Sequence, residues 1–185
     1  EPLKNIAITI NDKKQKGEAV ITKYGIEGNA IYGLSPQIRD VFDLGKEAEV
    51  FIDFKPTLKV EDIFKKLSRT KSNIATALRK DLKLSKAMVA LLKVSLSKEE
   101  YTDLMSLSNF IKKFSIKLGN TAPIDEAIST AGGIKLDAID ANFELKKYTD
   151  IYCIGEMLDW DAPTGGYLLQ ACFSMGAYVG KKITD

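Results

Sequence analysis

The sequence predicts an α+β fold, in which a small antiparallel β-barrel or sheet with a helical block is followed by a further strand and a buried helix. Three observations lead to this prediction. Apolar residues alternate with polar ones in the first 56 residues, they then recur at helical spacing, and a nearly unbroken apolar run lies close to the end. With 45% hydrophobic and 28% charged residues, the 185-residue chain has the composition of a globular protein.

The first 56 residues are expected to form a small sheet or barrel. Every second residue is apolar from Ile6 to Ile10, a polar turn occupies 11–17, and an extended pattern resumes over 19–22, which predicts a hairpin. A second alternation runs from Val50 to Phe54. It ends before Pro56, which has no amide hydrogen to continue a ladder.

Residues 57–113 are predicted to be helical, because the spacing of apolar residues changes to 3.6. Ser72 and Ser85 are candidate N-caps, and Ser97 with Glu100 makes a capping box. The apolar stripes of this block are interpreted as core rather than as a binding groove. An extended return strand is expected over 114–118.

A second segment, 119–185, begins at a composition break over 119–123. Within it, Ile151–Ile154 is interpreted as a buried strand. The run Gly165–Gly180 predicts a helix that is apolar on nearly every side and must therefore be buried against other protein segments. That cover is expected from the first segment or from sequence outside this chain. The run is too short for a membrane span.

Composition excludes several classes of function. A net charge of +2 argues against nucleic-acid binding, and the absence of histidine removes histidine-based catalysis and the usual zinc sites. Cys153 and Cys172 are expected to be free thiols, although sequence leaves a disulfide open. No signal peptide is visible, so a cytoplasmic protein without membrane contact is expected. The chain begins with Glu1, which fits a piece of something longer.

The segment 150–170 carries the candidate site. It combines the predicted strand, the pair Gly155-Glu156, an acidic turn containing Asp159, and a Gly pair that opens the last helix. Ligands of open α/β sheets lie beyond the carboxyl ends of strands, where a glycine permits close approach and a carboxylate accepts hydrogen bonds from ribityl or ribose hydroxyls. Free amides at the helix start favour negative charge. The competing interpretation is a tight turn with no ligand.

This segment also resembles a known family. The runs Gly155–Asp159 and Pro163–Tyr167 resemble the C-terminal signature of the NAD(FAD)-utilizing dehydrogenase-like flavoproteins, a group related to aminoacetone oxidase, and one uncharacterised subfamily in particular. Thr22–Gly28 resembles a second family motif, Thr-His-x-Gly-Leu-Ser-Gly-Pro. Here Lys23 replaces the histidine, Glu27 the serine and Asn29 the proline. Ala131-Gly132-Gly133, followed by Ile139-Asp140, is a weaker third match.

The resemblance implies that 1–118 is an insert domain and 119–185 the C-terminal segment of an FAD-binding α/β domain. It further implies part of an FAD-dependent oxidoreductase, with a small-molecule substrate and NADH or NADPH as candidate reductant. No glycines here are spaced as G-x-G, so a Rossmann-type FAD-binding domain is expected upstream in the same protein, and this chain alone is expected to be inactive. The implied cofactor-binding residues are Gly133, Gly155, Glu156, Asp159, Thr164, Gly165, Gly166 and Tyr167. Tyr24 and Glu27 are candidates for the substrate side. The alternative is a non-enzymatic partner-binding or structural module.

Overall fold

The computed structural model of the protein describes residues 1–162 and 166–184. The chain divides into two compact units, Glu1–Asn120 and Thr121–Asp185. The fold combines an antiparallel five-stranded sheet with helices, so a mixed α and β architecture is confirmed.

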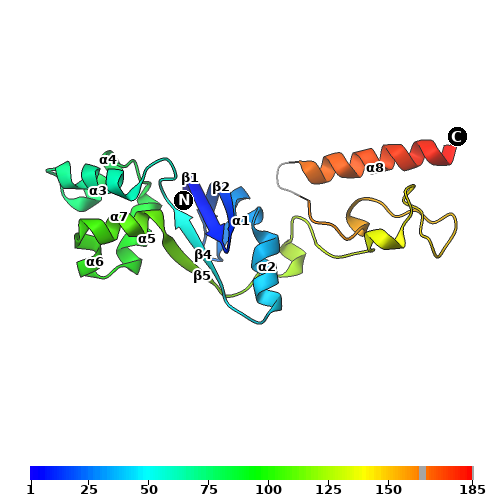
Figure 1. Ribbon diagram of the computed structural model, residues 1–185, viewed down its shortest axis with the longest axis horizontal. Helices are drawn as coiled ribbons and strands as arrows, with labels where there is room; N and C mark the ends of the chain where they lie inside the picture. The colour runs from blue at the N-terminus through cyan, green and yellow to red at the C-terminus, as the bar shows by residue number, and fades with distance from the viewer. Residues whose placement is uncertain (163–165, 185) are drawn as a thin grey trace. The chain divides into compact units, whose positions relative to one another are not determined.

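The first unit is built on a single sheet (Figure 1). Its strands are β1 (Pro2–Ile10), β2 (Lys13–Ile21), β3 (Ile26–Glu27), β4 (Ala48–Asp53) and β5 (Phe114–Leu118). They lie in the order β3-β2-β1-β4-β5, and every neighbouring pair is antiparallel. The predicted hairpin is therefore confirmed as β1–β2, and the return strand as β5. Because β3 and β5 lie at opposite edges, the sheet is open rather than a closed barrel.

The sheet is central to the core because its middle strands are covered on both faces. Ile6, Ala7 and Ile8 of β1 are successive residues, so their side chains alternate between faces, yet all three are buried. Most of the largest buried side chains of the unit come from β1, β4 and the helices. Phe54, directly after β4, is also fully buried, and its ring centre lies 5.2 Å from that of Phe114.

Two helices that the sequence pattern did not predict lie within the first 56 residues, namely α1 (Asn29–Tyr32) and α2 (Ser35–Asp43). Pro36 stands in the first turn of α2, where its missing amide hydrogen costs no hydrogen bond. Sequence analysis placed only strands in this region. It did not account for helices this short, which pack with few apolar residues.

The predicted helical block is confirmed as five helices, which gather together in Figure 1. They are α3 (Val60–Arg69), α4 (Ile74–Lys80), α5 (Lys86–Ser95), α6 (Lys98–Thr102) and α7 (Leu104–Lys112). Ser85 caps α5 and the Ser97–Glu100 capping box opens α6, as predicted. The prediction for Ser72 was wrong. Asn73 is the residue directly before α4, and its side-chain oxygen accepts a hydrogen bond from the Thr76 amide at 2.9 Å.

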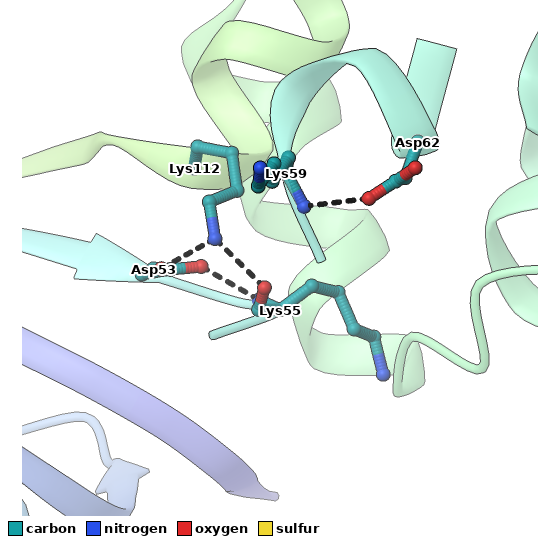
Figure 2. A network of polar contacts seen from close by, with 5 residues as sticks. All are labelled: Asp53, Lys55, Lys59, Asp62 and Lys112. Carbon is teal, nitrogen blue, oxygen red and sulfur yellow. Dashed lines mark hydrogen bonds and ion pairs between the residues drawn. The ribbon is translucent and has the colours of Figure 1, made fainter. Parts of the chain in front are cut away.

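A half-buried ion pair links the sheet to α7 (Figure 2). The Lys112 ammonium lies 2.7 Å from the Asp53 carboxylate and donates a second hydrogen bond, of 2.8 Å, to the carbonyl oxygen of Lys55. The other Asp53 oxygen accepts a hydrogen bond from the Lys55 amide at 2.9 Å. The carboxylate at the end of β4 is thus satisfied within the unit.

The second unit contains little regular structure before its last helix. Its elements are the 3₁₀ turns η1 (Ile124–Glu126), η2 (Leu136–Ala138) and η3 (Gly155–Met157), and the helix α8 (Tyr167–Thr184). The predicted buried strand Ile151–Ile154 was wrong. Within this range only Tyr152 forms a bridge, with Glu144, and Ile151 is 47% exposed. The facing segment contains Phe143 at a positive φ of 66°, a conformation that interrupts an extended ladder.

The helix predicted at the apolar run is confirmed as α8. Within its own unit, however, α8 is not buried on all sides. Among its described side chains Val179 is buried. Cys172 and Met175 are partly buried on the same stripe. Other large apolar side chains are exposed, namely Tyr167, Leu169, Phe173, Tyr178 and Ile183. Among the described residues, no helix has both the length and the apolar character needed to cross a membrane.

Candidate functional site

Gly133 lies directly against the backbone of the candidate segment. Its φ is 144°, and a Cβ atom at this position would lie 2.5 Å from the carbonyl oxygen of Met157. Two backbone hydrogen bonds hold the contact, from the Ile134 amide to Met157 and from the Asp159 amide to Ile134, each 2.8 Å long. Only glycine fits this approach. The structure therefore joins two of the three motifs on which the family resemblance rests.

Gly155 joins the same segment to α8. It is buried with φ 67°, and an added Cβ would lie 3.3 Å from the Cys172 sulfur. Its amide lies 3.3 Å from the sulfur of Met175, and its carbonyl oxygen accepts a hydrogen bond from Nε1 of Trp160 at 3.2 Å. The close approach that sequence analysis assigned to a ligand is made here to the protein's own helix. Cofactor binding by Gly133 and Gly155 stays a prediction.

Glu156 and Asp159 are exposed side chains on either side of buried Leu158. Sequence analysis expected Glu156 at the carboxyl end of a buried strand. That expectation was wrong, because no strand precedes Gly155 and the segment runs along the surface of its unit. No hydrogen bond or ion pair joins the Glu156 or Asp159 side chain to another described residue. These two carboxylates are therefore free to accept hydrogen bonds from hydroxyl groups.

Two of the other predicted cofactor-binding residues, Gly166 and Tyr167, lie at the start of α8, and their contact with a cofactor stays a prediction. Gly166 has a φ of 83°, open space where a Cβ would lie, and a carbonyl that accepts the Gln170 amide at 3.1 Å. Tyr167, the first helical residue, is 62% exposed. Thr164 and Gly165 lie outside the described residues.

Residues outside the predicted cofactor-binding set hold α8 in place. The Asp140 carboxylate accepts hydrogen bonds from the amides of Asn142 and Glu144, at 2.8 and 2.9 Å. The backbone hydrogen bond from Glu144 is the main reason that the pKa of Asp140 is lowered. The hydroxyl of Tyr178, on α8, donates to the Asn142 side chain at 3.2 Å, and its ring packs edge-on against Phe143. The weak motif match at Ile139-Asp140 was the available signal.

The two cysteines that sequence analysis noted are free thiols. Cys153 is buried and Cys172 is partly exposed. In the part of the chain that the structure describes, no cluster of three or more His, Cys, Asp or Glu side chains is placed to hold a metal ion.

The predicted substrate-side residues belong to the first unit and follow β2. The Thr22 hydroxyl accepts hydrogen bonds from the Tyr24 and Gly25 amides and donates to a Glu27 carboxylate oxygen 3.4 Å away. Tyr24 is 83% exposed, with the Lys23 ammonium 4.6 Å from its ring centre. At Gly28, where φ is 108°, a Cβ would meet the Glu18 carbonyl oxygen at 2.9 Å. These contacts describe a tight turn, and a substrate role for Tyr24 and Glu27 stays a prediction.

Comparison with known proteins gives one family. A family model described as HI0933-like protein Rossmann domain matches residues 6–182. The match runs through both compact units, so it does not separate an insert domain from the remainder.

One similar curated protein is a 3-dehydro-bile acid delta(4,6)-reductase of Clostridium scindens, which is 25% identical over 181 residues. The alignment covers 91% of this chain and 44% of the reductase. The chain thus spans less than half the length of this relative.

Proposed function

This chain belongs to the HI0933-like Rossmann-domain family, and from that membership we propose that it is part of a flavin-dependent oxidoreductase. The observation that carries the proposal is the family match over residues 6–182. The reductase relative supports a redox reaction, because the activity in its name is a reduction. We propose the reaction class alone, with a small-molecule substrate and with NADH or NADPH as reductant.

In this proposal the second unit supplies the flavin-side contacts. Glu156 and Asp159 would accept hydrogen bonds from ribityl or ribose hydroxyls, since both carboxylates are exposed and have no partner among the described residues. The helix α8 would direct its first amides and the positive end of its dipole at the pyrimidine edge. When bound, the flavin would supply the electron transfer, and these residues would orient it.

The residues that hold this segment fit such a role. Close contacts at Gly133 and Gly155 hold the backbone of 155–159 against Ile134 and α8. The backbone that carries the Glu156 and Asp159 carboxylates is therefore fixed in position. A cofactor site needs support of this kind from surrounding contacts. The dinucleotide half is proposed to lie upstream in the same protein, in a Rossmann-type domain, because no G-x-G-x-x-G turn occurs in these 185 residues. Residues 1–118 would then be the insert domain and 119–185 the returning segment.

An FAD titration by calorimetry tests the proposal. It compares the 185-residue chain with a longer form of the protein that includes a glycine-rich dinucleotide-binding segment. We expect FAD binding by the longer form. In that form Glu156→Gln should weaken FAD binding about tenfold or more, since a hydrogen bond to a charged group contributes about 1.5–3 kcal/mol.

Asp125→Asn is the matched control, because Asp125 is another exposed carboxylate of the second unit. It should leave FAD affinity unchanged. If the longer form does not bind FAD, the flavin proposal is wrong. If Glu156→Gln and Asp125→Asn behave alike, the assignment of Glu156 is wrong although the flavin proposal stands.

A second candidate function is a partner-binding or structural module without enzymatic activity. The observation that favours it is the exposed apolar surface of α8 within its unit, where Phe173 is 70% and Leu169 is 60% exposed. The same titration separates the two functions, since this candidate expects no flavin affinity in either form of the protein.

A further inference from the structure

A groove in the first unit has six cations among the 14 residues that line it. It has a volume of about 940 Å³ and lies where the start of β1, α4, α5 and the loop after β4 come together. Its charged lining consists of Lys4, Lys55, Arg79, Lys80, Lys83 and Lys86, with Glu1 as the single carboxylate. We call this the cationic groove. The whole chain has a net charge of only +2, so positive charge is concentrated here.

The cations of the groove form no ion pair with a carboxylate of residues 1–162 or 166–184, whereas Lys112 and Lys117 each form one. The acid closest in sequence to Lys55 is Asp53, and Asp53 is already paired with Lys112. Figure 2 shows the Lys55 side chain extending away from that pair.

The Lys55 ammonium is held at the backbone of Lys83. Lys55 is half-buried and donates a hydrogen bond of 3.3 Å to the carbonyl oxygen of Lys83. Burial is the main cause, and the Lys83 charge the second, of a lowered pKa at Lys55. The arrangement disfavours the charged form of Lys55 in the free protein. An anion in the groove would reverse that effect.

The backbone at Lys83 adds an independent observation. Lys83 follows α4 with a φ of 52°, the left-handed conformation that glycine or asparagine usually adopts at this position of a helix end. The Leu84 amide donates to the Leu78 carbonyl at 2.9 Å, which holds the turn. A lysine therefore occupies a strained position at the edge of the groove, where glycine would relieve the strain.

The floor and size of the groove indicate the class of ligand. Leu84 and Met88 are buried below it, and its volume lies within the range of small-molecule sites, about 300–1,000 Å³. None of the residues that line it is aromatic, so the stacking platform typical of single-stranded nucleic-acid sites is lacking. Lysine and arginine together are the usual ligands of phosphate groups.

We propose that the cationic groove binds a small molecule that carries two or more phosphate groups. The anion would lie between Lys55, Arg79 and Lys83, and the apolar floor would contact the rest of the molecule. This site belongs to the first unit, and its existence does not depend on the flavin proposal.

The test is calorimetric titration of the full chain with inorganic pyrophosphate at constant ionic strength. The unaltered protein should bind, and the double variant Arg79→Gln/Lys83→Gln should bind at least tenfold more weakly. The matched control is Lys13→Gln/Lys14→Gln, which removes the same charge from exposed lysines at the start of β2 and should change affinity less than twofold. The charge-conserving pair Arg79→Lys/Lys83→Arg should retain binding. An NMR titration should show that the pKa of Lys55 rises when pyrophosphate is present.

Three results would overturn the proposal. The first is no binding of pyrophosphate at millimolar concentration, and the second is equal weakening in the groove and control variants, which would indicate a general charge effect. The third is displacement of pyrophosphate by a short single-stranded oligonucleotide that binds more tightly, which would make the groove a nucleic-acid site. Circular dichroism of each variant checks that the fold is retained.

Discussion

Replacing Gly133 by alanine tests whether the close backbone contact holds the candidate segment in place. The new Cβ would lie 2.5 Å from the Met157 carbonyl oxygen and 3.1 Å from the Leu158 carbonyl carbon. Both atoms belong to backbone, so neither can turn aside as a flexible side chain would. The segment 157–158 must move away from Gly133, and the two hydrogen bonds that join it to Ile134 must lengthen or break.

The expected cost follows from these contacts. An alanine with φ near 144° bears a strain of about 1–3 kcal/mol. Loss of the two 2.8 Å hydrogen bonds adds about 0.5–1.5 kcal/mol each. The free energy of unfolding of the second unit should therefore fall by about 2–6 kcal/mol. Gly132→Ala is the control, since Gly132 has φ 89° and no atom within 4 Å of its added Cβ, so that only the strain of about 1–3 kcal/mol applies.

Urea denaturation followed by tryptophan fluorescence measures the difference. Trp160 is the single tryptophan of the chain and hydrogen-bonds to Gly155, so its emission reports on this segment. Hydrogen exchange at the Ile134 and Asp159 amides gives a local readout, and both amides should lose protection in Gly133→Ala alone. Equal destabilisation by Gly132→Ala and Gly133→Ala, with both amides still protected, would refute the reasoning.

Three further predictions concern the same fold. Gly155→Ala should destabilise the second unit by about 1–3 kcal/mol, because φ is 67° and the new Cβ lies 3.3 Å from the Cys172 sulfur. In urea denaturation, the double variant Gly155→Ala/Cys172→Ala should recover part of the lost free energy of unfolding. If it recovers none, the contact with Cys172 is not the cause. Leu107→Ala, in the core of the first unit, should cost about 2–5 kcal/mol by circular dichroism in urea, whereas Leu44→Ala, at a residue 70% exposed, should change stability by less than about 0.5 kcal/mol. The pKa of Asp140 is lowered in the folded protein, so its carboxylate stabilises the fold at pH values above about 3.9, the pKa of an aspartate in the unfolded chain. This stabilisation is lost as the pH falls through the pKa of Asp140 in the folded protein. An NMR titration of the carboxyl group checks this, and a midpoint at or above about 3.9 would contradict it.

Much of the first unit followed from local patterns. The alternation in Ile6–Ile10 and the polar residues after it predicted the hairpin, and Ser85 and the Ser97–Glu100 box marked two helix starts. These features depend on residues close in sequence, so a pattern can reveal them. The short helix α2 was missed, because its nine residues contain a single buried one, Ile38.

The candidate site was less accessible to sequence reasoning. The motifs identified Gly133, Gly155 and Glu156, but the strand expected before Gly155 does not form, so Glu156 lies on an exposed segment rather than at the end of a strand. An apolar run such as Ile151–Ile154 is compatible with a strand only if a partner offers an extended edge. The partner segment has Phe143 in a left-handed conformation, and the run contains nothing that indicates this.

The sequence by itself determined the first hairpin, the helical block with its return strand, and the helix near the end, because each depends on residue type and short-range spacing. It also singled out Gly133 and Gly155. Only the tertiary structure decided what those glycines touch: Gly133 meets the Met157 carbonyl and Gly155 meets Cys172. It alone brought Lys4, Lys55 and the lysines around α4 and α5 into one groove. Such contacts join residues that are far apart in the sequence. Their distances depend on how the helices and strands pack together, and no local sequence pattern specifies that packing.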